Sequence, residues 1–423
     1  MFGKKQPEVI VVGAGPVGLF TALCLAKRGV RVQVVDEAPR RAMHSYALAL
    51  HGDALTLLQD HGLAEKALAG SYRVKTVGFC DKTERRAQMS LASLSHDYPF
   101  AAVARQNLIE GLLEGALEEV GVKILWNHRA ARFYDQGDCV RVTVDKMVKA
   151  SVGYSVSHTE LVAASSKESD VAFLIGADGH RSLVRRQAEI DFPECAEPRQ
   201  FAVFEFETNA DLKHEMSVVL DPNSTNVLWP LPEGFCRWSF EIDATPNLSD
   251  SRTKDRLAVD IGAMRFPMLS KDLLRRLIDE RAPWFKASIG EIRWRMAVRF
   301  ETRLADRFGD GRVWLVGDAG HLTGPVGAQS MNVGLREANQ LATTIASILR
   351  DGTSLDGLQT YSAGRREEWR ELLSMDGGLE ATGETDPWIR DYVDGLLPCI
   401  PGTGKTLSEL AGQLGIEWAT VAS

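Results

Sequence analysis

VIVVGAGPVG, residues 9–18, is the stretch that decides the fold expected of this chain. Its first four residues form a continuous β-branched run, which predicts a buried strand. The glycines that follow permit a tight turn into a helix over residues 19–28. A second strand over residues 30–35 then ends at Asp36, 23 residues after Gly13. A strand, glycine turn, helix and acidic residue at this spacing are typical of a βαβ unit that binds a nucleotide.

In such a unit the turn holds a pyrophosphate, because backbone N–H groups at the start of the helix face its negative charge. We therefore expect phosphates at the turn residues Gly13, Gly15, Pro16, Val17 and Gly18. Asp36 is expected to accept hydrogen bonds from a ribose diol, with the adjacent carboxylate of Glu37 as the alternative acceptor. The competing interpretation is a glycine-rich strand-to-helix turn beside a solvated aspartate.

Two further glycine motifs follow strand-like segments later in the chain. The second motif, Gly176-Ala-Asp178-Gly179, directly follows the segment Val171–Ile175. The third motif, Gly317-Asp318, directly follows Val313–Val316. Each motif is weak by itself, because short glycine patterns recur by chance. Their order, together with the first motif, indicates FAD. The carboxylate of Asp318 is expected beside the ribityl chain of the flavin or nearby phosphate-linked groups.

A loop over Gly324–Gly334 then leads into a long helix expected over Asn332–Leu349. Backbone N–H groups in this loop are suited to stabilise the negative charge that develops along the flavin N1 and C2 carbonyl edge on reduction. An ordinary helix-capping loop is the alternative. The loop residues that we expect at the flavin are Pro325, Gly327, Ala328, Ser330, Met331 and Asn332.

The remaining segments alternate between helical and period-two patterns. Residues 53–69 and 107–120 are amphipathic and predict helices. The polar stretch Ser151–Ser169 predicts a hairpin or an exposed excursion. From about residue 200 the apolar period is two, with strands expected over Phe201–Glu207 and Phe235–Ile242. These strands predict an antiparallel sheet inserted into the cofactor fold.

The patterns together predict an α/β fold, namely a discontinuous Rossmann-like FAD-binding domain with an inserted, mainly antiparallel β-sheet substrate domain and C-terminal helices. About forty C-terminal residues are expected to form short helices and turns packed on the outside. The expected boundaries are 1–75, 101–185 and 291–370 for the FAD-binding domain, 76–100 and 186–290 for the substrate domain, and 371–423 for the C-terminal segment.

Composition and charge exclude several other classes of protein. The 423 residues are 44% hydrophobic and 25% charged, which is ordinary for a globular protein. A net charge of -8 argues against a broad nucleic-acid-binding surface. No apolar run approaches the roughly 18 residues of a membrane span, so we expect a cytoplasmic protein without a membrane partner. The six cysteines are scattered, without metal-ligand spacing or a C-x-x-C pair, so we expect no metal site.

The first motif, Asp36, Gly176–Asp178 and the segment from Gly317 to Asn332 together resemble the single-component FAD-dependent aromatic hydroxylases of the para-hydroxybenzoate hydroxylase type. The resemblance covers roughly residues 8–350. It implies that NADPH or NADH reduces FAD and that O2 then forms a flavin C4a-hydroperoxide. This species hydroxylates an aromatic or polyketide-like small molecule. A monomer or a homodimer is implied.

The resemblance also assigns further residues. Asp178 and Gly179 belong to a motif associated with both FAD and NAD(P)H. Arg105 matches a position that usually contacts FAD, and Gln106 takes that position if the register slips by one.

The chain departs from the family pattern at two places. Tyr46 stands where the family commonly has an arginine that helps to hold FAD. We therefore expect either that Arg40, Arg41 or His44 takes over this contact or that FAD binds more weakly. Ser330 replaces a glycine common in the flavin-facing loop and adds a side chain where close approach is usual. We expect these changes to alter flavin movement.

The sequence does not identify a general base. His321 is the one candidate catalytic residue, and a structural role in its loop is the alternative. Four aromatic residues are candidates for a substrate pocket or for the core of the sheet, namely Trp229, Trp238, Phe204 and Phe206.

Several other functions are compatible with the same fold. An epoxidase, a Baeyer-Villiger enzyme or a tetracycline-inactivating oxygenase stays open, because a fold does not determine its chemistry. A flavin reductase or dehydrogenase without oxygen insertion is a further alternative. A non-catalytic flavin-binding protein is the alternative from outside the enzymes.

Overall fold

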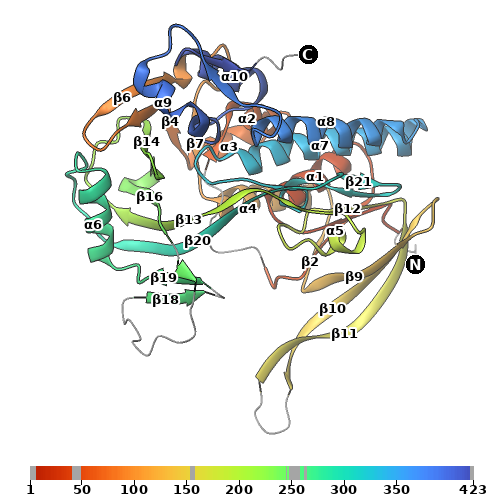
Figure 1. Cartoon of the computed structure of the whole chain (residues 1–423). Helices are drawn as coiled ribbons and strands as arrows, with labels where there is room; N and C mark the ends of the chain where they lie inside the picture. Colours follow the sequence, from red (N-terminus) through yellow and green to blue (C-terminus); the bar gives the residue numbers. More distant parts are fainter. Residues whose placement is uncertain are drawn as a thin grey trace.

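The computed structural model describes residues 6–40, 49–152, 158–243, 245–246, 258–261 and 264–419. In these ranges a six-stranded sheet and an eight-stranded sheet lie beside each other, with helices over the first and a long hairpin projecting from it (Figure 1). None of the helices in these ranges combines the length and the apolar character that crossing a membrane requires.

The six-stranded sheet explains why the three glycine motifs meet. Its β1 lies between β2 and β12, and Val12 pairs with both Val35 and Gly176. These strands are parallel, as are β12 and β22, so their carboxyl ends share one edge. The strand order is β21 (Gly309–Asp310), β22 (Val313–Leu315), β12 (Phe173–Gly176), β1 (Val9–Val12), β2 (Val32–Asp36) and β8 (Ile124–Trp126).

Each face of this sheet is covered by a different layer. Val9 and Val11 of β1 are fully buried in a core that they share with helices α1, α4 and α7. Ile10 and Val12 point to the other face, into a second core shared with the β9–β10–β11 sheet and α5. Because both faces are covered, the strand is a continuous apolar run rather than an alternating one. The helices are α1 (Pro16–Lys27), α4 (Gln106–Glu119), α5 (Leu183–Gln187) and α7 (Gln329–Asp351).

The eight-stranded sheet is antiparallel except between β5 and β14. One of its faces packs against α6 (Lys271–Arg281), through alternate residues such as Trp238 and Phe240. The other face joins the core of the six-stranded sheet through Val203 and Val227. The strand order is β23 (His321–Leu322), β20 (Ile292–Leu304), β13 (Glu194–Glu207), β16 (Phe235–Glu241), β15 (Ser224–Pro230), β14 (Glu215–Asp221), β5 (Thr76–Cys80) and β6 (Arg85–Ser90).

The predicted period of two in β16 is confirmed, but Arg237 and Ser239 on its polar face do not face solvent. Arg237 is 5% exposed and Ser239 is 4% exposed, because the second face of the sheet packs toward the six-stranded sheet. Most of the polar face of this strand therefore lies inside the molecule, and Glu241 at its end is half-buried.

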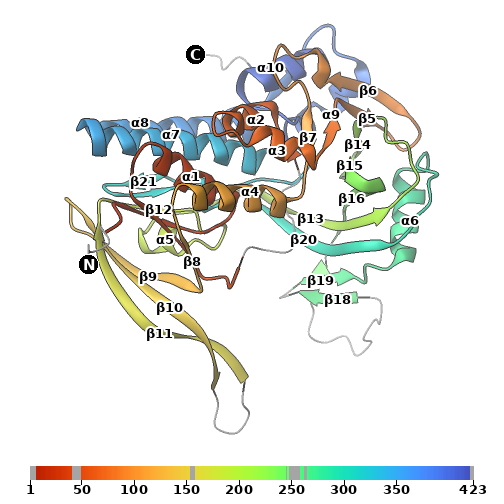
Figure 2. The same ribbon diagram turned by 180° about the vertical axis from the view of Figure 1, so that it is seen from behind.

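Of the two alternatives expected for residues 151–169, a hairpin or an exposed excursion, the structure has a hairpin, and it begins earlier, at Val140. Strands β9 (His128–Asp135), β10 (Val140–Val152) and β11 (His158–Val171) form an antiparallel sheet. Its end extends away from both larger sheets in two opposite views (Figure 2).

Two expectations about helices are wrong. The single helix expected over residues 53–69 is two helices, α2 (Gly52–Gln59) and α3 (Ala64–Ala69), because Gly62 between them has φ +72°. The C-terminal segment does not pack only on the outside. Cys399, Ile400 and Leu407 are fully buried in the same core as α1 and α7, since η4 (Leu397–Cys399) and α10 (Gly404–Gly412) close over that core.

The other elements are short or peripheral. They are β3 (Ala49–Leu50), β4 (Tyr72–Val74), β7 (Ala101–Val103), β17 (Thr245–Pro246), β18 (Ala258–Ile261), β19 (Met264–Pro267), β24 (Leu379–Ala381), β25 (Ile416–Trp418), α8 (Asp356–Leu372), α9 (Pro387–Leu396), η1 (Leu91–Ser93), η2 (Pro232–Gly234) and η3 (Gly317–Ala319).

Candidate cofactor and active site

The first glycine turn is closed by backbone packing and open toward the start of α1. Gly13 has φ +107°, and a Cβ there would lie 2.2 Å from the carbonyl oxygen of Ala177. A Cβ on Gly18 would lie 2.2 Å from the carbonyl oxygen of Gly13. A Cβ on Gly15, by contrast, would meet nothing within 4 Å. The space beside Gly15 and the N-terminus of α1, which begins at Pro16, therefore fits a phosphate group.

Asp36 is oriented by the same turn. The backbone N–H of Ala14 donates to its Oδ2 at 2.6 Å, and that of Ala38 donates to its Oδ1 at 2.7 Å. An ionised carboxylate accepts about four hydrogen bonds, so the two oxygens retain capacity for a ribose diol. Glu37 is exposed, whereas Asp36 is half-buried. The geometry favours Asp36 as the acceptor.

The second motif uses its carboxylate to begin a helix. Ser182 Oγ donates to Asp178 Oδ1 at 2.5 Å, and the backbone N–H of Leu183 donates to Oδ2 at 2.7 Å. Burial raises the pKa of Asp178, and these hydrogen bonds oppose that shift. Asp178 therefore shapes the turn that carries Gly179, rather than presenting a free carboxylate.

Arg185 links the second motif to the third, and sequence reasoning did not identify it. Its Nη1 donates to the carbonyl oxygen of Ala319 at 2.8 Å, and its Nη2 donates to that of His180 at 2.9 Å. Ser182 caps α5, which contains Arg185, and a serine directly before the apolar pair Leu183-Val184 is the sequence signal that could have indicated this helix start.

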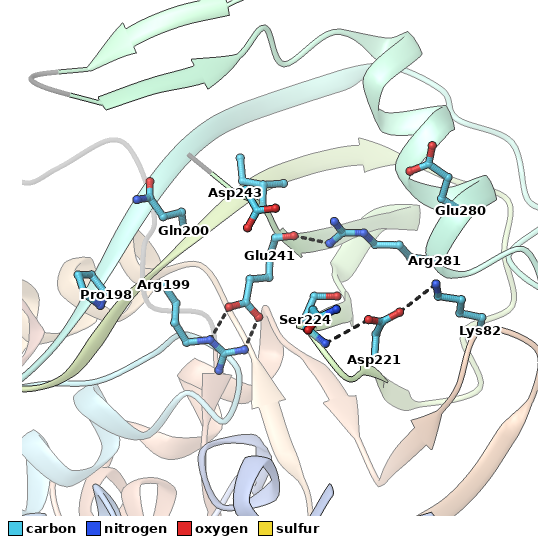
Figure 3. Close-up of a pocket in the computed structure, with 12 residues that line it drawn as sticks. Lys82, Pro198, Arg199, Gln200, Asp221, Ser224, Glu241, Asp243, Glu280 and Arg281 are labelled. Carbon is cyan, nitrogen blue, oxygen red and sulfur yellow. Dashed lines mark hydrogen bonds and ion pairs between the residues drawn. The ribbon is translucent and has the colours of Figure 1, made fainter. Parts of the chain in front are cut away.

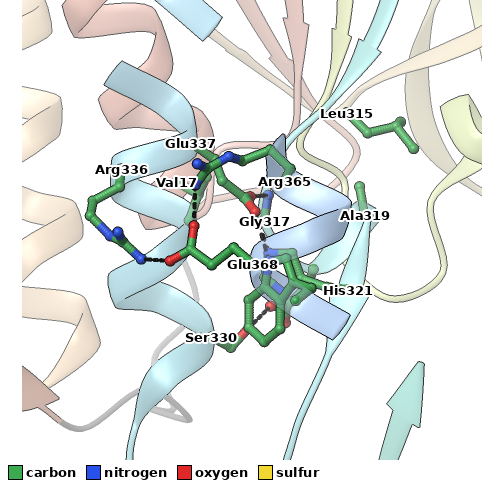
Figure 4. A network of polar contacts seen from close by, with 12 residues as sticks. Val17, Leu315, Gly317, Ala319, His321, Ser330, Arg336, Glu337, Arg365 and Glu368 are labelled. Atoms are coloured by element: carbon green, nitrogen blue, oxygen red, sulfur yellow. Dashed lines mark hydrogen bonds and ion pairs between the residues drawn. The ribbon is translucent and has the colours of Figure 1, made fainter. Parts of the chain in front are cut away.

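The third motif exposes Asp318 next to the start of α7. Ser330 Oγ donates to Asp318 Oδ1 at 2.5 Å (Figure 4). The residue that departs from the family pattern therefore contacts the carboxylate that we assigned to the ribityl chain.

The buried carboxylate of Glu337 contacts the third motif at Gly317 (Figure 4). Glu337 accepts hydrogen bonds from the backbone N–H of Gly317 at 2.8 Å and from Trp369 Nε1 at 2.8 Å. His321 Nε2 lies 3.1 Å from the same carboxylate. Burial would raise the pKa of Glu337, but His321 and the donors lower it below its usual value. The sequence signal for this supporting role was an acidic residue on the apolar stripe of α7. Glu337 lies four residues after Val333 and four before Leu341.

His321 belongs to this support rather than to a reaction centre. Its side chain is fully buried and stacks on Trp369 with ring centroids 3.8 Å apart. A general base must reach the substrate, and this ring has no exposed surface. The geometry favours the structural role of His321.

The loop before α7 is tied to distant parts of the chain. The backbone N–H of Gly327 donates to the carbonyl oxygen of Pro398 at 2.8 Å. Asn332 Oδ1 accepts from the backbone N–H of His51 at 2.8 Å, and the His51 ring nitrogen Nε2 lies 2.9 Å from the Gly327 carbonyl oxygen. Burial lowers the pKa of His51 to about 4, so the ring is neutral and donates to that carbonyl.

Ala328 in this loop has φ +53°, a left-handed conformation that favours glycine. Pro325, Ser330 and Met331 are half-buried nearby. The start of α7 thus has a fixed backbone, as the predicted flavin contact requires.

Arg105 and Gln106 stand at the N-terminal end of α4. Gln106 Nε2 donates to Glu110 Oε1 at 2.7 Å. Burial lowers the pKa of Arg237 in the eight-stranded sheet, and the positive charge of Arg105 adds to that shift. Arg40 is exposed, and Arg41, His44 and Tyr46 lie outside the described residues.

A polar cavity of about 440 Å³ lies at the end of the eight-stranded sheet and is separate from these motifs (Figure 3). Lys82 pairs with Asp221 at 2.9 Å, and Arg199 pairs with Glu241 on its wall. No candidate cofactor residue lines this cavity.

The aromatic residues suggested for a substrate pocket divide between the two faces of this sheet. Phe204, Phe206 and Trp238 pack against α6 together with Phe285. Trp229 is 1% exposed in the core shared with the six-stranded sheet. Core packing accounts for all four.

A family model described as an FAD binding domain matches residues 6–375. The chain belongs to this FAD-binding family. FAD is therefore its cofactor, and the predicted family of FAD-dependent aromatic hydroxylases and the α/β fold are confirmed. The prediction of an enzyme, a flavoprotein monooxygenase, is confirmed as well.

The similar proteins include several named monooxygenases. A 12-dehydrotetracycline 5-monooxygenase/anhydrotetracycline 6-monooxygenase of Streptomyces rimosus is 26% identical over 421 residues, which cover 97% of this chain and 77% of the relative. A 6-methylpretetramide 4-monooxygenase of Streptomyces rimosus is 28% identical over 373 residues, covering 87% of this chain but only 60% of the relative.

Solved structures agree on the fold. The p-nitrophenol 4-monooxygenase of Pseudomonas putida has a TM-score of 0.71 and 23% identity, with 97% of this chain and 98% of that chain covered. The anhydrotetracycline hydroxylase of Streptomyces rimosus has a TM-score of 0.64 and 23% identity, with 97% and 75% covered.

Proposed function

We propose that this monooxygenase uses NADPH or NADH and O2 to hydroxylate an aromatic or polyketide-like small molecule. One oxygen atom enters the substrate as a hydroxyl group and the other leaves as water, with the two electrons supplied by the reduced nicotinamide. The observation that carries the proposal is the meeting of three FAD motifs at one edge of the six-stranded sheet, next to the second sheet. The names of the relatives support the substrate class.

When bound, FAD supplies the storage of two electrons and the activation of O2. The protein residues that would hold it follow the three motifs. The N-terminus of α1 beside Gly15 would face the pyrophosphate, and Asp36 would accept from a ribose. Asp178 would keep the turn at Gly179 in place, and Asp318 would accept hydrogen bonds from the ribityl chain.

The start of α7 would stabilise negative charge on the reduced flavin. Its backbone position is held by Asn332, by the neutral ring of His51 and by the contact of Gly327 with the C-terminal segment. A donor that is already oriented needs no reorganisation when charge develops.

The test is to purify the protein, record its flavin spectrum, and follow NADPH and NADH oxidation under air with phenols, indoles and aromatic polyketides. Bound FAD, substrate-stimulated oxidation and incorporation of one atom from ¹⁸O₂ into the product are expected. Product structures distinguish hydroxylation from epoxidation, Baeyer-Villiger oxidation or tetracycline inactivation. Nicotinamide oxidation with every substrate but without labelled product would contradict the proposal and indicate a reductase. Bound FAD without any nicotinamide oxidation would indicate a non-catalytic flavin protein.

The domain boundaries, the cytoplasmic location and the choice between monomer and homodimer stay predictions.

A further inference from the structure

A second cavity, of about 230 Å³, lies between the N-termini of α2 and α10, which are at the same end of the molecule in both views (Figure 1, Figure 2). No residue of the three cofactor motifs lines it. Its wall includes Thr403 and the first three residues of α10, together with Arg336 of α7 and the carboxylates of Asp53 and Glu409. The cavity is therefore separate from the cofactor site.

The first turn of α10 presents backbone donors that the described part of the chain leaves unpaired. The N–H groups of Gly404, Lys405 and Thr406 precede the first bond of the helix, which Leu407 donates to the Thr403 carbonyl. Thr403 is the N-cap, but its hydroxyl accepts from none of them. Such N–H groups carry the positive end of the helix dipole. The turn therefore offers three donors to an acceptor in the cavity.

The Thr403 side chain is the independent observation that points to a ligand. Thr403 is 4% exposed, and its hydroxyl has no hydrogen-bond partner among the residues that the structure describes. This oxygen is not one of the unpaired side-chain atoms that are sealed from solvent, so it opens on the cavity that Thr403 lines. A buried hydroxyl without a partner is costly. We therefore expect the occupant of the cavity to accept a hydrogen bond from Thr403.

The charged side chains on the wall are compatible with an anion. Lys405 is 87% exposed and lies 3.5 Å from Glu409, an exposed pair that holds the ammonium weakly. Asp53 Oδ1 already has a partner, His96 Nε2, at 3.2 Å. An anion would meet the cations of Lys405 and Arg336 and would be repelled chiefly by Asp53.

A phosphate group fits this arrangement, because its oxygens accept several N–H groups at a helix N-terminus. The segment Pro401-Gly-Thr-Gly-Lys405-Thr406 lacks the first glycine and the preceding strand of a nucleotide-binding P-loop, so a nucleoside triphosphate is not expected. We propose that the cavity binds a phosphate group, as inorganic phosphate or as a phosphate monoester, through Thr403 and the first turn of α10.

The segment before α10 connects this cavity with the flavin-facing loop. Gly402 N–H donates to the Ile400 carbonyl at 2.9 Å. Gln329 at the start of α7 donates through Nε2 to the carbonyl oxygens of Leu397 and Ile400, at 3.3 Å and 3.4 Å. A ligand that orders the N-terminus of α10 should therefore also hold the start of α7 and tighten FAD binding. By reciprocity, FAD should tighten phosphate binding by the same factor.

The test titrates the FAD-loaded protein with inorganic phosphate and with phenyl phosphate by calorimetry, at constant ionic strength. The variants are T403V, T403S, K405Q and D53N. K271Q is the matched control, because Lys271 also begins a helix, α6, but the N-terminus of α6 is capped by Ser270. The Kd for FAD is measured for the apoprotein with and without phosphate.

The wild type is expected to bind at least one probe with a Kd of about 1 mM or below. T403V should weaken binding about tenfold and K405Q about threefold, whereas T403S and K271Q should leave it unchanged. D53N should tighten binding about threefold, because it removes a negative charge from the wall. Saturating phosphate should lower the Kd for FAD about threefold in the wild type but not in T403V. Tighter binding of the ester indicates a phosphorylated metabolite as the ligand, and equal affinities indicate inorganic phosphate.

The absence of saturable binding of both probes would overturn the inference. An equal loss of affinity in K271Q would do the same, because it would show a general effect of surface charge. Weaker phosphate binding in D53N would show that the cavity prefers a cation. If T403V fails to fold, K405Q, whose side chain is exposed, decides the question. An unchanged Kd for FAD at saturating phosphate would overturn the connection with the flavin-facing loop.

Discussion

The six-stranded and eight-stranded sheets present their polar side chains at different places along their strands. In the six-stranded sheet, Asp36 and Asp318 stand at or just after strand ends, and all ends of the parallel strands share one edge. In the eight-stranded sheet, Arg237 and Glu205 lie within antiparallel strands and meet across them. The first arrangement can be inferred from local motifs, whereas the second depends on the register between strands.

The largest effect is expected from G13A. The new Cβ would clash with the Ala177 carbonyl in a conformation with positive φ, so the free energy of unfolding should fall by at least about 5 kcal/mol. Urea unfolding measures this loss. G15A is the matched control, because a Cβ there meets no protein atom within 4 Å. G15A should keep its stability and raise the Kd for FAD about tenfold, since we assign the space beside Gly15 to the phosphate. Equal loss of stability in the two variants would contradict this division.

The variants E337A and W238A perturb the two parts of the molecule separately, and both should lose a similar amount of stability. Removing the Glu337 carboxylate leaves three buried donors without their acceptor. Removing the Trp238 ring leaves a cavity beneath α6. Each variant should therefore lose about 3–5 kcal/mol of unfolding free energy. Only E337A should weaken FAD binding, because Glu337 holds Gly317 whereas Trp238 faces away from the cofactor. Titration with FAD well below both melting temperatures checks this. Equal weakening of FAD binding in W238A would show that the sheets do not act separately.

The pH dependence of stability should include a contribution from His51. Its pKa is about 4 in the folded protein, because burial lowers it, against 6.5 for an unperturbed histidine, so the unfolded chain binds a proton first as the pH falls. Stability should therefore be complete above pH 6.5 and decrease toward pH 4, by about 2 kcal/mol at pH 5. Comparing urea unfolding of wild type and H51Q at pH 7 and pH 5 isolates this contribution. H51Q retains an N–H donor and should lose less between the two values; a parallel loss would contradict the assignment.

The smallest effect is expected from S330G. Ser330 donates to the Asp318 oxygen that we assign to the ribityl chain, so its removal should tighten FAD binding by about threefold. Fluorescence quenching on FAD addition measures the change. S330A should behave similarly, because it also removes the hydroxyl. If both variants bind FAD more weakly, Ser330 supports the orientation of Asp318 instead of competing for it.

Much of the fold followed from local patterns, and the exceptions have physical causes. The β1 run and the strand ending at Asp36 were identified from residue type and spacing, because short-range sterics and the glycine turn control them. The single helix expected over residues 53–69 was wrong, since Gly62 adopts φ +72° and ends its first half. The burial of Arg237 was missed, because alternation along a strand identifies two faces but not what covers each one.

The sequence by itself determined the local structure around the glycine turns and hence the class of cofactor, because these turns require particular residues at fixed spacing. Only the tertiary structure decided which distant side chains meet, at the site and in the second sheet. His51 meets Gly327 across 276 residues, Glu337 meets Gly317 across 20, and Arg237 meets Glu205 across 32. Such pairs depend on strand register and helix packing, which arise from the whole core and not from any single segment.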